Sequence, residues 1–130
     1  MRLTATGVAL AFISVLAACG LRQSSLEALN EQPSVEYRGH YTVGPDGSWF
    51  RECGAAPSDS AWWVTAMGTA AQQVDSARAA GRLQEGQPAY VHWRAVLTRG
   101  GEVGPPGSVA LLVREIVSLR SPQPGDCSTR

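Results

Sequence analysis

Alternation of apolar and polar residues with a period of two is the feature that most restricts how this chain folds. Between residues 35 and 43 the odd positions hold Val, Tyr, Gly, Tyr and Val, whereas the even positions hold Glu, Arg, His and Thr. Residues 89–98 repeat the pattern, and their apolar face consists of Val91, Trp93, Ala95 and Leu97. Because successive side chains of a strand point to opposite faces, both segments predict half-buried antiparallel strands.

Three further strands are expected at 48–52, 61–66 and 109–119. The sequence "GPDG" at 44–47 predicts a hairpin turn between the first two strands, since Pro45 fixes its own φ and glycine tolerates a positive φ. The last strand is apolar almost without interruption up to Arg114. That continuity indicates burial on both faces or a β-bulge.

Residues 68–83 follow a helical rhythm instead. The apolar face of this helix consists of Met67, Ala70, Ala71, Val74 and Ala77, and Gly81 is a suitable C-terminal stop. The resulting order is β-β-β-α-β-β, which is the order of an OB-fold with a helix between strands three and four. We therefore expect an all-β domain with one short helix, closed as a small five-stranded OB-like barrel. A generic small α+β sandwich is the alternative.

The first 18 residues are typical of a secretory signal. Arg2 supplies the positive start, and the apolar run from Val8 to Ala18 is shorter than the roughly 20 residues that a membrane span needs. The signal ends in "LAAC", which resembles the lipobox of bacterial lipoproteins. The resemblance implies that Cys19 carries a diacylglyceryl group and becomes the acylated N-terminus. By the family's sorting rule, Gly20 after the cysteine implies delivery to the outer membrane.

The chain thus divides into a signal at 1–18, a lipidated cysteine with a polar tether at 19–34, and a domain at 35–130. Loss of Arg2 leaves ten arginines against eleven acidic residues, and the chain has no lysine. Without a positive net charge we expect no nucleic-acid partner. The expected partners are the membrane, reached through the lipid, and a protein of the cell envelope.

Once Cys19 is assigned to the lipid, Cys53 and Cys127 remain. In an oxidising compartment two cysteines of a small domain most simply form one structural disulfide. A redox-responsive pair is the alternative. A reactive nucleophile or a metal ligand is less favoured, because there is no Cys-x-x-Cys motif and no histidine close to Cys53 in sequence.

The aromatic and cysteine pattern resembles the C-terminal OB domain of NlpE-type outer-membrane lipoproteins. The matching features are Gly39-x-Tyr41, "WFREC" at 49–53, "WWV" at 62–64, "AYVHWRA" at 89–95 and a late cysteine. The resemblance implies a disulfide between Cys53 and Cys127 and a link to envelope stress signalling, surface sensing and copper tolerance. Copper or redox chemistry tied to that family's Cys-x-x-Cys motif is not implied, because this sequence lacks the motif.

Two other groups of side chains are candidates for contacts. Alternation directs one of Trp62 and Trp63 inward and the other outward, and the outward one is the better interaction surface. His40 and His92 fall on the polar faces of neighbouring strands, where they form either a weak metal or pH-sensing site or two solvated histidines.

No constellation of residues indicates catalysis, a cofactor or a resident metal. We therefore expect a non-enzymatic, membrane-anchored module for envelope interaction or stress sensing. The alternative is a small-ligand-binding or inhibitor lipoprotein that uses the Gly/Pro-rich loop at 99–108.

Overall fold

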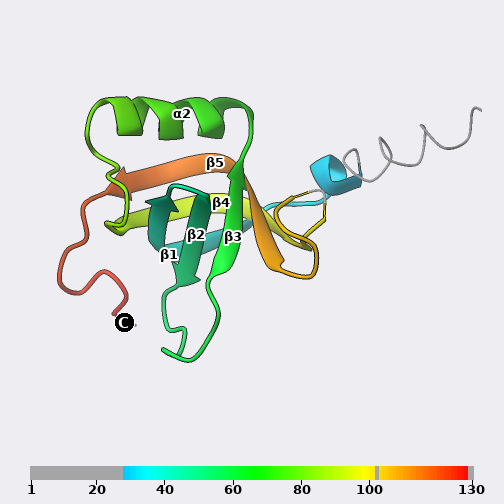
Figure 1. The fold of residues 1–130 in the computed structure, drawn as a ribbon, viewed down its shortest axis with the longest axis horizontal. Coiled ribbons are helices and arrows are strands. Elements are labelled where there is room, and N and C mark those ends of the chain that lie inside the picture. Colours follow the sequence, from blue (N-terminus) through cyan, green and yellow to red (C-terminus); the bar gives the residue numbers. More distant parts are fainter. Residues whose placement is uncertain (1–27, 102, 129–130) are drawn as a thin grey trace, which may run out of the picture. The chain divides into compact units, whose positions relative to one another are not determined.

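The computed structural model describes residues 28–101 and 103–128, and Gln32–Arg130 form one compact unit. Five strands close into a barrel in the order β1-β2-β3-β5-β4, and β4 pairs again with β1 (Figure 1). Only β3 and β5 pair in parallel. The elements are β1 (Val35–Gly44), β2 (Gly47–Glu52), β3 (Trp62–Ala66), α2 (Gly68–Ala79), β4 (Ala89–Arg99) and β5 (Val109–Arg120). The expected OB-like class and element order are confirmed.

Aromatic side chains fill the centre of the barrel, as the alternating pattern predicts. Tyr41 and Phe50 face each other across the β1–β2 hairpin, and Trp93 projects from β4 toward both. The ring centroid of Trp93 lies 5.2 Å from that of Tyr41 and 5.1 Å from that of Phe50. Burial of aromatic surface on this scale dominates the energetics of so small a core.

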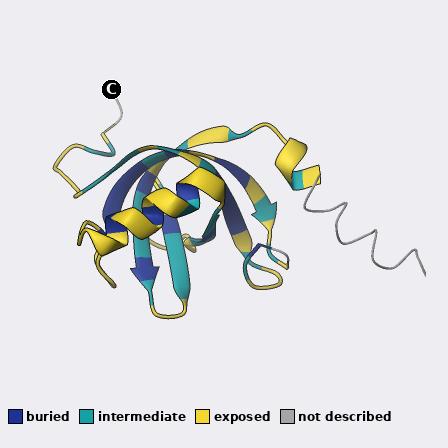
Figure 2. Ribbon diagram, turned by 90° about the horizontal axis from the view of Figure 1, so that it is seen from above, coloured by how far each residue is buried: buried dark blue, intermediate teal, exposed yellow. Residues whose placement is uncertain are grey.

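Helix α2 covers one end of the barrel. Its buried residues Ala70, Val74 and Ala77 belong to the core cluster, and Figure 2 shows the remaining face turned to solvent. The helix ends at Ala79, and the chain turns at Gly81, the predicted C-terminal stop, although the helical pattern extends in sequence to residue 83. Gly81 has φ +73°, and its N–H donates to the carbonyl of Arg78, so the chain leaves the helix there.

Strand β5 is buried on both faces over its first half, which accounts for its nearly continuous apolar sequence. Leu111 and Val113 point into the core cluster, whereas Ala110 and Leu112 are also buried but lie outside that cluster. The β4–β5 ladder also shifts register between His92 and Trp93 and again beyond Arg94. Two-sided burial and bulges, predicted as alternatives, therefore occur together.

Candidate functional site

At the end of the barrel away from α2, three apolar residues lie on the core-facing side of their strands but are exposed to solvent. Val35 faces Ala95 in the β1–β4 ladder, and Leu97 faces Leu111 in the β4–β5 ladder; Ala95 and Leu111 are fully buried. Directly opposed residues share a face, so Val35, Leu97 and Val109 all have the core-facing orientation. Yet they are 56%, 44% and 41% exposed. We call these three residues the mouth.

Aromatic rings form the floor of a hollow that Val109 of the mouth borders. Trp62 is half-buried, with its ring centroid 5.8 Å from Tyr37 and 6.0 Å from Phe50. Phe50, Trp62 and Val109 line a cavity of about 810 Å³. This volume lies within the range of roughly 300–1,000 Å³ typical of ligand sites. Of the three mouth residues, Val109 borders this hollow, which is large enough for a side chain or a small molecule.

Three charged residues line this cavity, and two of them are held within the 53–61 loop. The Nη1 group of Arg51 donates to the carbonyl oxygens of Ala56 (3.2 Å) and Asp59 (2.8 Å). The Asp59 carboxylate accepts from the Ala56 N–H at 2.9 Å. Among the residues that the structure describes, the carboxylate of Glu52 has no hydrogen bond or ion pair. Burial, and secondarily the Glu52 charge, raises the pKa of Tyr37, so this carboxylate acts on the aromatic floor.

The two cysteines meet at the edge of the same cavity. The sulfur atoms of Cys53 and Cys127 lie 2.09 Å apart, at disulfide distance, and Cys53 lines the cavity. The backbone N–H of Cys53 donates to the carbonyl of Arg38 at 2.8 Å, which extends the β1–β2 pairing to the cysteine. The C-terminal tail is thereby attached to the end of β2.

A charged clamp holds the tail at a second point. Arg120 Nη2 lies 2.6 Å from Asp126 Oδ1, and the guanidinium carbon of Arg120 lies 4.5 Å from the centroid of the Tyr90 ring. Asp126 also accepts from the Gln123 N–H at 2.6 Å. The hydrogen bond from Arg120 is the main reason that the pKa of Asp126 lies below its ordinary value. Ion pair and disulfide together fix residues 121–127.

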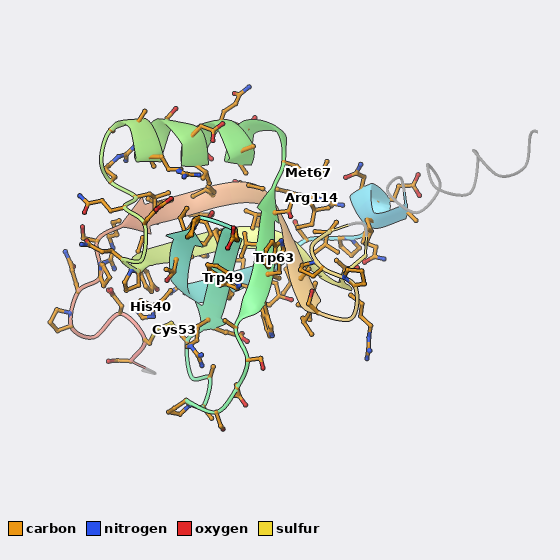
Figure 3. The ribbon with its side chains drawn as sticks, in the orientation of Figure 1. His40, Trp49, Cys53, Trp63, Met67 and Arg114 are labelled. Carbon is orange, nitrogen blue, oxygen red and sulfur yellow. A yellow bond between two sulfur atoms is a disulfide. The ribbon has the colours of Figure 1, made fainter. Side chains whose placement is uncertain are left out.

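The structure shows which of the adjacent tryptophans points outward. Trp62 packs against the core cluster, whereas Trp63 lies on the outside beside Trp49 (5.8 Å between centroids; Figure 3). A Cβ added to Gly104 would lie 2.5 Å from Cδ1 of Trp63, and the neighbouring Val103 is buried. Trp63 is thus partly covered by the 99–108 loop, which folds back on the barrel. The floor tryptophan of the cavity is Trp62.

The two histidines lie on adjacent strands but do not face each other. His40 is opposite Tyr90, with ring centroids 6.1 Å apart, and His92 is opposite Arg38. The Nε2 atom of His92 lies 3.4 Å from a carboxylate oxygen of Glu36, and this contact is the chief reason for the lowered pKa of Glu36. Within the described part of the chain, no group of three or more His, Cys, Asp or Glu residues could hold a metal ion.

Sequence reasoning missed the mouth and Glu52. Val35, Leu97 and Val109 occupy apolar positions near strand ends, where the alternating pattern does not distinguish a core residue from an exposed one. Their convergence depends on the order β1-β4-β5 around the barrel. Prediction of the mouth would have required the registers of the strand ladders, which the residue types do not reveal.

The lipobox and its Cys19 lie outside the described residues. Within the described ranges no helix has the length and apolarity to cross a membrane. Comparison of the chain with known proteins finds no matching family model, no similar curated protein and no similar solved structure. The function is therefore inferred from the geometry of the barrel and from the sequence motifs.

Proposed function

We propose that this protein is a lipid-anchored, non-enzymatic interaction module of the bacterial cell envelope that binds a protein partner at the mouth. The observation that carries the proposal is the contrast between the two ends of the barrel. Helix α2 buries one end, whereas Val35, Leu97 and Val109 stay exposed at the other, where Val109 borders a cavity with an aromatic floor. Exposed apolar residues gathered over a cavity are typical of binding sites.

The path of the chain supports anchoring near this site. Strand β1 begins at Val35, so the proposed tether from Cys19 to Ser34 joins the domain at the mouth itself. Arg114 Nη1 donates to the Gln32 carbonyl at 2.5 Å and fixes the last part of that path. Residues 28–31 of this segment are helical; a flexible chain of the same length as residues 19–34 would have an end-to-end distance of about 20 Å. If the protein is anchored in the outer membrane through Cys19, the mouth lies within reach of other envelope proteins.

Stress sensing, implied by the NlpE resemblance, is the finer form of the same proposal. It is supported by the position of Cys53, which both lines the cavity and pairs with Cys127. A partner in the cavity would contact the segment that the disulfide attaches to the tail. Binding of a partner at the mouth and the presence of the Cys53–Cys127 disulfide would then influence each other.

Site-specific photo-crosslinking in intact cells tests the interaction proposal. A photoreactive amino acid at Leu97 is compared with one at Asp75, an exposed residue on α2. We expect a discrete crosslinked product from position 97 and none from position 75. Equal products at both positions, or none at either, would contradict binding at the mouth.

A small ligand is the second candidate for the same cavity. Gly107 and Ser108 of the 99–108 loop line this cavity together with Trp62. A ligand-binding role for the loop, the alternative function raised by the sequence, requires such a position. The two functions are separated by the crosslinking experiment, because a small-ligand site yields no protein adduct at position 97. A ligand would instead be retained through purification and identified by mass spectrometry of the native protein.

A further inference from the structure

We infer that the mouth binds a basic side chain of its partner, with the alkyl stem over Trp62 and the cationic group at Glu52. This inference rests on the proposed function and adds the chemistry of the partner. A lysine or arginine side chain combines a long apolar stem with a terminal charge. The cavity offers a complementary surface for each part.

Charge in the cavity favours a cation. Of the three charged lining residues, Arg51 and Asp59 are engaged by the backbone of the 53–61 loop, and the Glu52 carboxylate alone has no hydrogen bond or ion pair among the described residues. Arg51 keeps its positive charge, so the three lining charges sum to −1. Nearby, Glu36 and Arg94 form an ion pair with each other (3.5 Å), and Arg99 faces Val109 across the β4–β5 ladder. Arg99 does not line the cavity and forms no ion pair with Glu52. The available charge inside is therefore negative.

The floor is also suited to a cation. Trp62 is the half-buried ring that lines the cavity; it packs against Tyr37 and Phe50, with centroids 5.8 and 6.0 Å away, while Phe50 itself is only 1% exposed. The face of an aromatic ring carries partial negative charge and attracts ammonium and guanidinium groups, and tryptophan does so most strongly. The exposed aliphatic residues of the mouth would contact the stem and the neighbouring apolar residues of the partner. The arrangement thus selects a basic residue within an apolar segment.

The test uses the mature chain with Cys19→Ser, which carries no lipid and stays in aqueous buffer. The probes are acetylated and amidated peptides of the sequence Ser-Leu-Xaa-Leu-Ser, in which Xaa is lysine, norleucine or glutamate. Norleucine keeps the alkyl stem and removes the charge. Binding is followed by NMR shifts of the Trp62 indole N–H, with Trp62→Leu used to assign that signal and circular dichroism used to verify folding.

We expect the lysine peptide to bind about tenfold more tightly than the norleucine peptide, the effect of one exposed ion pair together with one cation–π contact. Glu52→Gln should remove most of this preference. Glu115→Gln, which neutralises an exposed carboxylate on β5, should leave it unchanged. The preference should also weaken as salt concentration rises.

Four results would overturn the inference or its premise. Equal binding of the lysine and norleucine peptides would refute a basic side chain while leaving the mouth as a binding site. A lysine preference that is unchanged in Glu52→Gln would refute Glu52 as the group that binds the cation. Tighter binding of the glutamate peptide would reverse the assigned charge. No binding of any peptide, combined with no crosslinked product at position 97, would refute the proposed function as well.

Discussion

Replacement of both Cys53 and Cys127 by serine removes the covalent link between β2 and the C-terminal tail. The two residues are 74 positions apart in sequence, so the disulfide closes most of the domain into a loop. In the chain-entropy description, cross-linking a loop of that size stabilises the folded state by about 4 kcal/mol through the unfolded ensemble. Small domains have roughly 5–15 kcal/mol of stability in total. The variant should therefore fold but be only marginally stable.

Urea unfolding followed by tryptophan fluorescence measures this loss. With a slope of about 1.5 kcal/mol per molar, a loss of 4 kcal/mol moves the midpoint down by roughly 2–3 M. Each single variant, Cys53→Ser or Cys127→Ser, should lose as much as the double variant, because either one breaks the link. Cys19→Ser is the matched control and should leave the midpoint unchanged. A loss below about 1 kcal/mol in the double variant would refute the view that the disulfide restrains the unfolded chain.

Two further perturbations test the outer supports of the barrel. Gly104→Ala should destabilise the fold by about 1–3 kcal/mol more than Gly107→Ala, as measured by chemical denaturation. Both glycines have a positive φ (+87° and +81°), but only Gly104 lies against Trp63. Equal losses of stability would mean that the backbone conformation alone causes the destabilisation. Asp126→Asn removes the partner of Arg120. Because the pKa of Asp126 is lowered in the folded state, the stability it contributes is present above the ordinary aspartate pKa of 3.8 and disappears as pH falls through the lower folded pKa. Thermal unfolding from pH 7 to pH 2 should thus show wild type more stable near neutrality and the two proteins converging in acid, whereas a difference independent of pH would contradict an ionic clamp.

The sequence predicts the strands, the helix and their order because each depends on local periodicity. Residues 35–43 alternate so regularly that only one face can enter a core, and the position of the helix then favours an OB-like barrel. The cysteine pairing was also accessible, since assignment of Cys19 to a lipid leaves a single pair. The stop at Gly81 was also predicted, whereas Leu83, the last apolar residue of the helical pattern, is buried but lies beyond that turn.

The candidate site depends on register, which local patterns do not determine. Alternation separates Trp62 from Trp63 but does not say which one faces the core; the pairing of Phe50 with Trp62 decides it. The same reasoning placed His40 and His92 on one face of neighbouring strands, which the β1–β4 register bears out. The register sets them diagonally, opposite Tyr90 and Arg38, and not opposite each other. The Gly/Pro-rich composition of the 99–108 loop suggests a loop that projects into solvent. In the structure the loop packs on the barrel, because Val103 is buried and Gly104 lies against Trp63.

The most direct test of the central claim compares two exposed aliphatic residues. Leu97 is 44% exposed at the mouth, and Val117 is 52% exposed on β5 away from it. With a photoreactive amino acid at position 109, we predict that Leu97→Asp abolishes the crosslinked product in intact cells while Val117→Asp preserves it. Both variants should retain stability to within about 1 kcal/mol, since neither side chain is buried. Undiminished crosslinking in Leu97→Asp, with the protein folded, would show that the mouth is not where the partner binds.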